Sequence, residues 1–569
     1  MTNELVYADA VDLAALIRSG EVTAVEVLDA HLDQIHTVNP LVNAVVTLDE
    51  EGARAAAEEA DRKRQAGEAL GPLHGLPISF KDTASTAGMR TTFGHPRTRD
   101  FVPESNDLHV QRILDAGAIR LGKTNVPEHA AGSHTFNRVF GVTRNPFDLS
   151  KSAGGSSGGA AAALASGFQP IADGSDMGGS LRNPASFCNV VGLRPTPGMV
   201  PNTDGANVFF PLAVNGPMGR TAEDTALLFS VMAGQAADDP FSSFPLDAPG
   251  LGGEPRPEDL AGLRIAFAPT LGGRVPVERE VLDVIEAQAA ALSAVGAIVE
   301  LDCPDLDGSD EAFRTLRAAA MDAAWGDDLA ADPELFNHFL AWNIREGARL
   351  TGRDVFRAEE TMTRLIRGAA GFFSRYDLVI APASQVAPFD ADLEYPTEIE
   401  GRRLETYLDW MRAPYLFTPL GLPALSVPAG FTPRRPSRRS PDDRSARQRR
   451  PPPAPGFVLR EAQPLLDHPS SRSCSPVSTT LASPKRLTIA LTPVAGIMVT
   501  PFLPFVATPT FWFGLPAALI WMGAMVLGTV AALQIVERSY LRDGGAEIDA
   551  AEAARDAARL AALNESEAH

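Results

Sequence analysis

The sequence predicts an α/β fold, because segments with the periodicity of amphipathic helices alternate with short apolar segments through residues 24–431. At 569 residues the chain is long enough for one large domain with additions, and no internal repeat is evident. Two glycine-rich segments, 153–159 and 174–180, interrupt the alternation. Glycine is used where a backbone needs unusual dihedral angles or comes close to a ligand. We therefore expect one large α/β domain with a functional site at these segments.

The first helix is predicted from its N-terminal cap. Thr23 to Glu26 matches a capping box, and the apolar spacing that follows predicts an amphipathic helix ending before Asn39-Pro40. The segments that continue the alternation are a strand over 41–48, a charged alanine-rich helix over 49–66, and a turn and strand over 72–82 with Lys81 at the far end.

Later segments repeat the same alternation. They are a helix and strand over 110–125, a helix over 160–167, a strand over 170–176, a strand, helix and strand between 262 and 301, a helix over 355–377, and late strands over 377–383 and 423–431.

Composition excludes several classes of function. The formal net charge of -21 argues against nucleic-acid binding, which needs clustered lysine and arginine, and it favours small neutral or cationic substrates. The cysteines, Cys188, Cys303 and Cys474, are widely spaced and match no metal-ligand pattern, so we expect free thiols in a reducing compartment. The N-terminal residues contain no secretory signal, and the predicted location is the cytoplasm.

The character of the sequence changes after Phe431. Residues 434–450 contain eight arginines and two aspartates, and a proline-rich segment follows. This composition cannot bury enough apolar surface to fold, so residues 433–486 are predicted to be a disordered linker after a domain that spans 1–432.

Residues 487–536 contain no charged side chain, and this length allows two membrane crossings of about 20 residues each. We therefore predict a transmembrane hairpin with its turn at 506–514. Lysine and arginine on both sides place both ends in the cytoplasm, so the hairpin would anchor the catalytic domain to the cytoplasmic membrane. Residues 537–569 are predicted to form a polar, solvent-exposed helix.

The second glycine-rich segment has the features of a catalytic loop. Ser180 follows Gly178-Gly179 at the end of a predicted strand, where successive backbone amides could face a developing oxyanion. A serine hydroxyl needs a base before it becomes a good nucleophile. Lys81 could act as that base if burial lowers its pKa; the alternative is a surface lysine paired with Asp82.

Four motifs in order, at 75–82, 122–133, 153–167 and 174–198, closely resemble the amidase signature family. The resemblance covers residues 4–432 and implies an α/β/α sandwich with a mixed central sheet and an enzyme that hydrolyses amides. The sequence departs from the family after Thr432, where the family's last strand and C-terminal helix are not recognisable.

The resemblance implies a Ser-cisSer-Lys triad. Ser180 would be the nucleophile that forms an acyl-enzyme, Ser156 the bridging serine behind a cis Gly155-Ser156 peptide, and Lys81 the base. The implied oxyanion hole consists of the backbone amides of Met177, Gly178, Gly179 and Ser180.

Other residues receive supporting roles. Asp176 and Arg182 are expected to pair and brace the loop, whereas Gly132 and Ser133 resemble family positions in the acyl pocket. Ser157 would either add a supporting hydrogen bond or cap the following helix. Neither a metal nor a cofactor is implied.

Several alternatives stay open. The chain could instead be the glutaminase-type A subunit of a tRNA-dependent amidotransferase, or an inactive membrane-associated relative. Its tail could be a natural membrane tether or the product of a frameshift that joined a truncated amidase to another gene. The expected partners are a small-molecule amide and the membrane; nucleic acid is not one, and a homodimer is common among family members.

Overall fold

The computed structural model describes residues 2–203, 207–242 and 257–432, together with the short backbone segments 457–459, 511–512 and 515–516. The chain divides into two units, 1–464 and 465–569. In the second unit, β18 (Phe511–Trp512) pairs antiparallel with β19 (Leu515–Pro516). The rest of the predicted membrane hairpin and the predicted polar helix at 537–569 lie outside the described residues. No helix within the described ranges is long and apolar enough to cross a membrane.

The larger sheet of the first unit has eight strands in the order β12-β11-β13-β17-β16-β9-β10-β8. The bounds along the chain are β8 Ile171–Asp176, β9 Val191–Arg194, β10 Val214–Gly219, β11 Arg264–Phe267, β12 Ile298–Leu301, β13 Leu378–Ala381, β16 Ala424–Ser426 and β17 Phe457–Leu459. Strand β11 is parallel to β12 and β13, and the remaining pairs are antiparallel. The predicted α/β class with a mixed sheet is confirmed.

A smaller sheet lies beside β8 and carries Lys81. Its strands are β1 (Val45–Leu48), β3 (Ile119–Thr124) and β2 (Pro77–Lys81), with β3 in the middle. Side chains join β2 to the β8 region: Gln169 Oε1 accepts a hydrogen bond from Ser79 N (2.8 Å), and Asp173 Oδ1 accepts one from Lys81 N (2.8 Å). Lys81 is thereby fixed between the two sheets.

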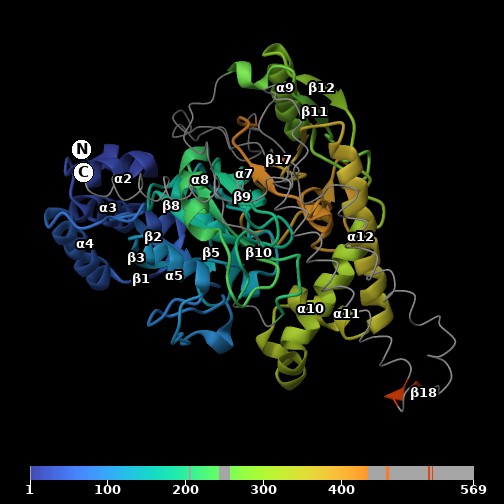
Figure 1. The fold of residues 1–569 in the computed structure, drawn as a ribbon, viewed down its shortest axis with the longest axis horizontal. Coiled ribbons are helices and arrows are strands. Elements are labelled where there is room, and N and C mark those ends of the chain that lie inside the picture. Colours follow the sequence, from blue (N-terminus) through green and yellow to red (C-terminus); the bar gives the residue numbers. More distant parts are fainter. Residues whose placement is uncertain are drawn as a thin grey trace, which may run out of the picture. The chain divides into compact units, whose positions relative to one another are not determined.

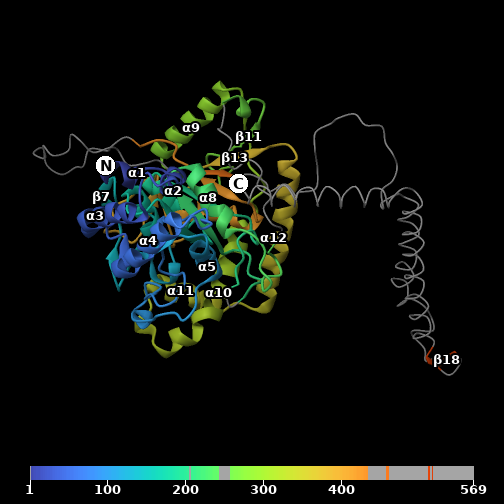
Figure 2. The same cartoon turned by 60° about the vertical axis from the view of Figure 1, so that its left-hand side comes forward.

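Helices surround both sheets (Figures 1 and 2). Their bounds are α1 Thr2–Tyr7, α2 Ala10–Ser19, α3 Ala24–Val42, α4 Glu50–Gln65, α5 Leu108–Asp115, α6 Gly158–Ala165, α7 Arg182–Cys188, α8 Ala222–Met232, α9 Arg279–Ala294, α10 Ser309–Ala331, α11 His338–Gly347, α12 Gly352–Phe373 and α13 Arg412–Tyr415. The two-residue strands are β4 Phe136–Asn137, β5 Gly141–Val142, β6 Arg144–Asn145 (paired with the longer β7 Asp148–Ser152), β14 Glu398–Ile399 and β15 Arg402–Arg403. Figure 1 shows α3 and α4 beside β1–β3, whereas α10, α11 and α12 lie on the opposite side.

Two apolar clusters form most of the core. One is built from α2–α6, α8 and strands β1, β2, β3 and β8, and the other from β11, β13, β16 and the helices α9, α10, α12 and α13. Helix α6 is buried from Gly158 to Leu164, and its small residues let it pack closely. A Cβ on Gly159 would lie 2.3 Å from Asn125 N, so only glycine fits there.

The prediction that the first long helix ends before Asn39-Pro40 was wrong. Helix α3 begins at the predicted capping box and continues through Pro40 to Val42. The Asn39 side chain accepts hydrogen bonds from the amides of Ala44 (2.8 Å) and Val45 (3.0 Å), and Asn43 ends the helix in a left-handed conformation. These contacts stabilise a last turn that proline alone would disfavour.

Strand β17 lies within the range that the sequence assigned to a linker. It inserts between β13 and β16 and is antiparallel to both. The short segment Phe457–Leu459 is apolar but lies between proline-rich and charged segments. The composition of these neighbouring segments therefore did not predict a strand. The sheet therefore contains a strand after Thr432, at the place where the sequence indicated none.

Candidate active site

Three serine hydroxyls surround the buried amine of Lys81. Lys81 Nζ lies 2.8 Å from Ser156 Oγ, 3.0 Å from Ser157 Oγ and 2.9 Å from Ser175 Oγ. Lys81 and Ser156 are each 1% exposed, and the Gly155-Ser156 peptide is cis. The lysine is therefore not the solvent-exposed partner of Asp82 that the alternative interpretation required.

The surroundings of Lys81 favour a neutral amine. Burial lowers its pKa to about 7, although the charges of Asp173 and Asp176 act in the opposite direction. A neutral amine has two N–H bonds and one lone pair, so it can donate to two of the three hydroxyls and accept from the third. This is the arrangement that a base in contact with a serine needs.

Ser180 lies in the second glycine loop, which adjoins the first. The amide of Ser157 donates to the carbonyl oxygen of Ser180 (3.2 Å), so the two loops are joined directly. Ser156 and Ser180 line the same cavity, and Ser180 is 7% exposed. The two serines that the sequence singled out are thus brought to one site.

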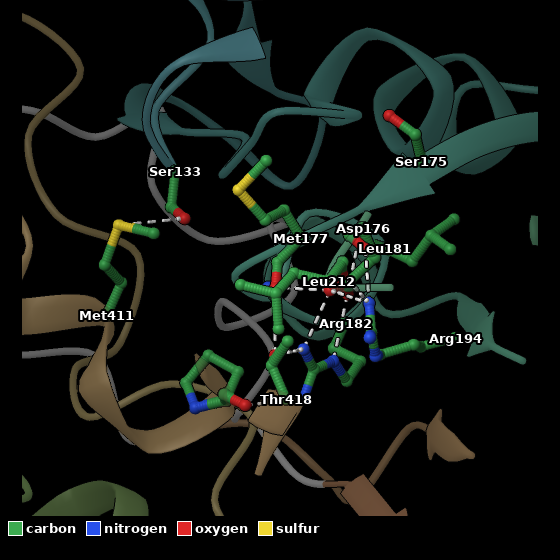
Figure 3. Close-up of polar contacts among 12 residues, drawn as sticks. Ser133, Ser175, Asp176, Met177, Leu181, Arg182, Arg194, Leu212, Met411 and Thr418 are labelled. Atoms are coloured by element: carbon green, nitrogen blue, oxygen red, sulfur yellow. Dashed lines mark hydrogen bonds and ion pairs between the residues drawn. The ribbon is translucent and has the colours of Figure 1, made fainter. Parts of the chain in front are cut away.

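The Asp176 carboxylate organises the loop that carries Ser180 (Figure 3). Arg182 donates to both of its oxygens, from Nε to Oδ2 (2.9 Å) and from Nη2 to Oδ1 (2.8 Å), which is the expected pairing. Burial alone would raise the pKa of Asp176, but the charge and hydrogen bonds of Arg182 and the charge of Arg194 hold it well below its usual range. The carboxylate is therefore charged and fully compensated.

Two further residues secure this loop, and the sequence did not indicate their contacts. Arg194 Nη1 donates to the carbonyl oxygens of Asp176 and Leu212 (2.9 Å for Leu212), and Thr418 Oγ1 donates to Met177 O (2.9 Å). Arg194 ends β9 and Thr418 precedes β16, so the nucleophile loop is held by segments that are distant in sequence.

One predicted oxyanion donor is engaged elsewhere. The amide of Gly179 donates to Asp176 Oδ1 (2.9 Å), so it faces the carboxylate and is not free for a substrate. Gly179 has a φ of +110°, which permits this turn. The amides of Met177, Gly178 and Ser180 remain as candidate donors.

The cavity at these serines has a volume of about 180 Å³. Its lining is mostly apolar and includes Ala130, Met177, Phe313, Met321, Trp325 and Met411. Gly132 lines it, whereas Ser133 is not one of its lining residues and donates to Met411 Sδ (3.4 Å; Figure 3). The site thus accommodates an apolar group beside the serines.

Ser157 and Ser175 show how the lysine is held. The Ser157 side chain makes no capping bond to α6 and contacts Lys81 instead, so the supporting role is the observed one. Sequence reasoning missed Ser175, although Asp173 and Ser175 are two apart on β8 and therefore share a face. The spacing of two residues between Asp173 and Ser175 is the feature of the sequence that could have indicated Ser175. In the structure Asp173 accepts a hydrogen bond from the backbone amide of Lys81.

Other reactive groups take no part in this site. Cys188 is fully buried, and burial raises the pKa of its thiol, so it is an inert core residue as predicted. Within the described ranges no group of three or more His, Cys, Asp or Glu side chains could hold a metal ion.

Known proteins resemble this chain in sequence. The sequence pattern of the Amidase family matches residues 26–483. This chain belongs to the amidase family. An acylamidase of Rhodococcus erythropolis is 37% identical to it over 437 residues, 75% of this chain and 89% of that protein.

Other relatives agree with this assignment. The A subunit of the glutamyl-tRNA(Gln) amidotransferase of Acidothermus cellulolyticus is 35% identical over 463 residues, 76% of this chain and 89% of that protein. The crystal structure of a bacterial aryl acylamidase of the amidase signature family superimposes with a TM-score of 0.70 at 27% identity, covering 80% of this chain and 93% of that one. This amidase is therefore an amide-hydrolysing enzyme with the amidase-signature fold, as its motifs predicted.

Proposed function

We propose that this amidase cleaves a carbon–nitrogen amide bond through an acyl-enzyme on Ser180, with Ser156 as the bridging proton carrier and Lys81 as the base. The observation that carries the proposal is the 2.8 Å contact between Lys81 Nζ and Ser156 Oγ in a cavity that Ser180 also lines. A base with a pKa near the working pH is the most effective, and the pKa of Lys81 is lowered to about 7.

Each proton in this reaction has a destination. Ser180 Oγ attacks the carbonyl carbon and gives its proton to Ser156 Oγ, while Ser156 passes its own proton to Lys81 Nζ. When the tetrahedral intermediate collapses, the carbon–nitrogen bond breaks, Ser156 Oγ gives one proton to the leaving nitrogen, and Lys81 Nζ returns its proton to Ser156. Water then attacks the ester on Ser180 by the same steps and releases the acid.

The amides of Met177, Gly178 and Ser180 would stabilise the oxyanion. Backbone donors fixed before the reaction need no reorganisation when the charge develops, and one such donor contributes about 3–4 kcal/mol. The Asp176–Arg182 pair supports this function by holding the loop rigid through Gly179. The catalytic centre would therefore depend on a buried ion pair that takes no part in the proton transfers.

The apolar lining supports aryl or alkyl amides as substrates. Phe313, Trp325 and Met411 would contact a ring or chain next to the scissile bond. The names of the related acylamidase and aryl acylamidase agree with this choice. Glutaminase activity in an amidotransferase is the second candidate, favoured by the 35% identity to the Acidothermus protein; stable copurification with partner subunits would support it.

The proposal is tested with a simple chromogenic anilide, 4-nitroacetanilide. Wild-type chain should hydrolyse it, whereas Ser180→Ala and Lys81→Ala should each lower kcat at least about 1,000-fold, as for other catalytic triads. Ser150→Ala, at an exposed serine, is the matched control and should be unchanged. Equal activity in Ser180→Ala and wild type would exclude the proposed nucleophile.

A further inference from the structure

A second charged group in the active-site cavity has no counterion. Arg317, on helix α10, lines the cavity together with Ser156 and Ser180, and its side chain is 3% exposed. Among the residues that the structure describes, no aspartate or glutamate forms an ion pair with it. The other charged residue of the lining, Asp176, is compensated by two arginines.

The contacts of Arg317 are all with neutral groups. Its Nη1 donates to Met321 Sδ (3.1 Å) and its Nη2 to the Tyr407 hydroxyl (2.8 Å), which in turn donates to Asn343 Oδ1 (3.2 Å). These bonds and the Tyr407 ring, whose centroid lies 5.8 Å from Arg317 Cζ, fix the orientation of the guanidinium, but sulfur is a weak acceptor and neither partner carries a negative charge. N–H groups of the guanidinium remain for another acceptor.

A neighbouring arginine shows the contrast. Arg314, one turn earlier on α10, pairs with Asp310 (3.0 Å) and Asp409 (2.6 Å) and does not line the cavity. Burying an unpaired charge is costly unless a partner compensates it. Arg317 therefore has the properties of a group that binds an anion inside the cavity.

We propose that Arg317 is an anion subsite and that the substrate is an amide with a carboxylate beyond an apolar spacer. The inference rests on the proposed amidase function. A guanidinium binds a carboxylate through two parallel hydrogen bonds, and the apolar lining that includes Phe313 and Trp325 fits the spacer. This substrate class differs from the neutral or cationic one that the net charge favoured, because Asp176 is compensated by two arginines and the charge of Arg317 in the cavity is not.

The kinetic test uses two matched pairs of substrates. Glutaryl-4-nitroanilide against pentanoyl-4-nitroanilide places the carboxylate on the acyl side, and 4-acetamidobenzoate against 4-acetamidotoluene places it on the amine side. Wild-type chain should prefer the carboxylated member of at least one pair. Arg317→Met should lower that preference, expressed as a ratio of kcat/KM values, about 10- to 100-fold.

The matched control is Arg349→Met, which removes an exposed arginine whose partner is Glu346. It should leave the ratio unchanged. A merely structural role of Arg317 would reduce kcat/KM equally for both members of a pair. No preference in either pair for wild type, or an unchanged ratio in Arg317→Met, would overturn the proposal. If Arg317→Met does not fold, Arg317→Lys is measured instead. It keeps the positive charge but cannot form the two parallel hydrogen bonds of a guanidinium, so the preference should again fall.

Binding separates this inference from the catalytic proposal. Calorimetric titration of the Ser180→Ala chain with 4-phenylbutyrate and with 4-phenylbutanol needs no turnover. At least tenfold tighter binding of the carboxylate, lost on adding Arg317→Met, is the expected result even if no amide is hydrolysed. Equal binding of the two ligands would refute the anion subsite, whereas inactivity towards every amide would refute only the proposed function.

Discussion

Lys81 illustrates how burial converts a common residue into a base. An ordinary lysine is charged at neutral pH, but Lys81 lies buried between two sheets, and the hydrogen-bond partners of its amine in the described part of the chain are three hydroxyls. Lys123, also buried, has its pKa lowered by burial to about 8, yet its amine donates to Ala84 O and Thr86 Oγ1. Neighbours, and not burial alone, distinguish the catalytic candidate from a structural lysine.

The pH dependence of activity follows from this assignment. Lys81 accepts a proton only when neutral, and burial lowers its pKa to about 7. We predict that kcat/KM falls about tenfold per pH unit below about 7 and is constant above it. Initial rates with a neutral anilide between pH 5.5 and 9 measure this, and a rate that is independent of pH would contradict the assignment.

Some site residues were predictable from the sequence and others were not. Lys81, Ser156, Ser180 and the Asp176–Arg182 pair stand in short motifs, so the sequence was sufficient to select them. Arg194 lies within the motif 174–198, but the motif alone does not indicate its contacts with the nucleophile loop. Arg317 is an isolated arginine on a helix, and no local pattern distinguishes it from an ordinary surface arginine; folding brings it to the cavity.

At the scale of elements, periodicity predicted helices α3–α6, α9 and α12 and strands β1–β3, β8, β11–β13 and β16, and it missed others, including the long helix α10. Strand β8 and helix α12 agree closely with their predicted ranges, and α12 has a long, regular apolar pattern. The end of α3 and the existence of β17 could not be predicted, since the first depends on the Asn39 side chain and the second on tertiary pairing.

Helix α6 requires glycine at position 159. A methyl group at position 159 would approach the Asn125 backbone at 2.3 Å, so Gly159→Ala should lower the free energy of unfolding by about 1–3 kcal/mol or more. Gly368→Ala on α12 is the control, because nothing lies within 4 Å of its Cβ and alanine favours helix by up to about 1 kcal/mol. Urea denaturation of both variants tests this, and equal effects would refute the packing argument.

Strand β17 should be essential to the sheet. It pairs with β13 and β16, so a proline at Val458 would remove a ladder donor in the sheet interior. Val458→Pro in the full chain should lower the melting temperature and the soluble yield, whereas Ser445→Pro in the arginine-rich tract should change neither. Thermal denaturation that is identical for both variants would mean that β17 contributes nothing.

At the scale of the whole molecule, the amidase family match reaches residue 483, beyond the arginine-rich tract. The sheet is therefore not left open between β13 and β16, as a domain ending at residue 432 would imply. Two accounts of the tail, a natural tether and a frameshift product, remain hypotheses that sequencing of the gene and transcript would separate.

The predicted membrane hairpin, which mostly lies outside the described residues, has a direct test. If residues 487–536 insert into a membrane, the full chain should sediment with membranes and be released by detergent but not by salt. A chain ending at residue 486 should stay in the supernatant. Recovery of both chains in the supernatant would exclude the tether.

The central claim, that Ser180 is a nucleophile activated through Lys81, is tested most directly with a fluorophosphonate probe and mass analysis of the labelled peptide. Wild-type chain should be labelled on Ser180, labelling should disappear in Ser180→Ala and Lys81→Ala, and Ser150→Ala should react like wild type. A folded wild-type chain that stays unlabelled, or label on another serine, would contradict the account.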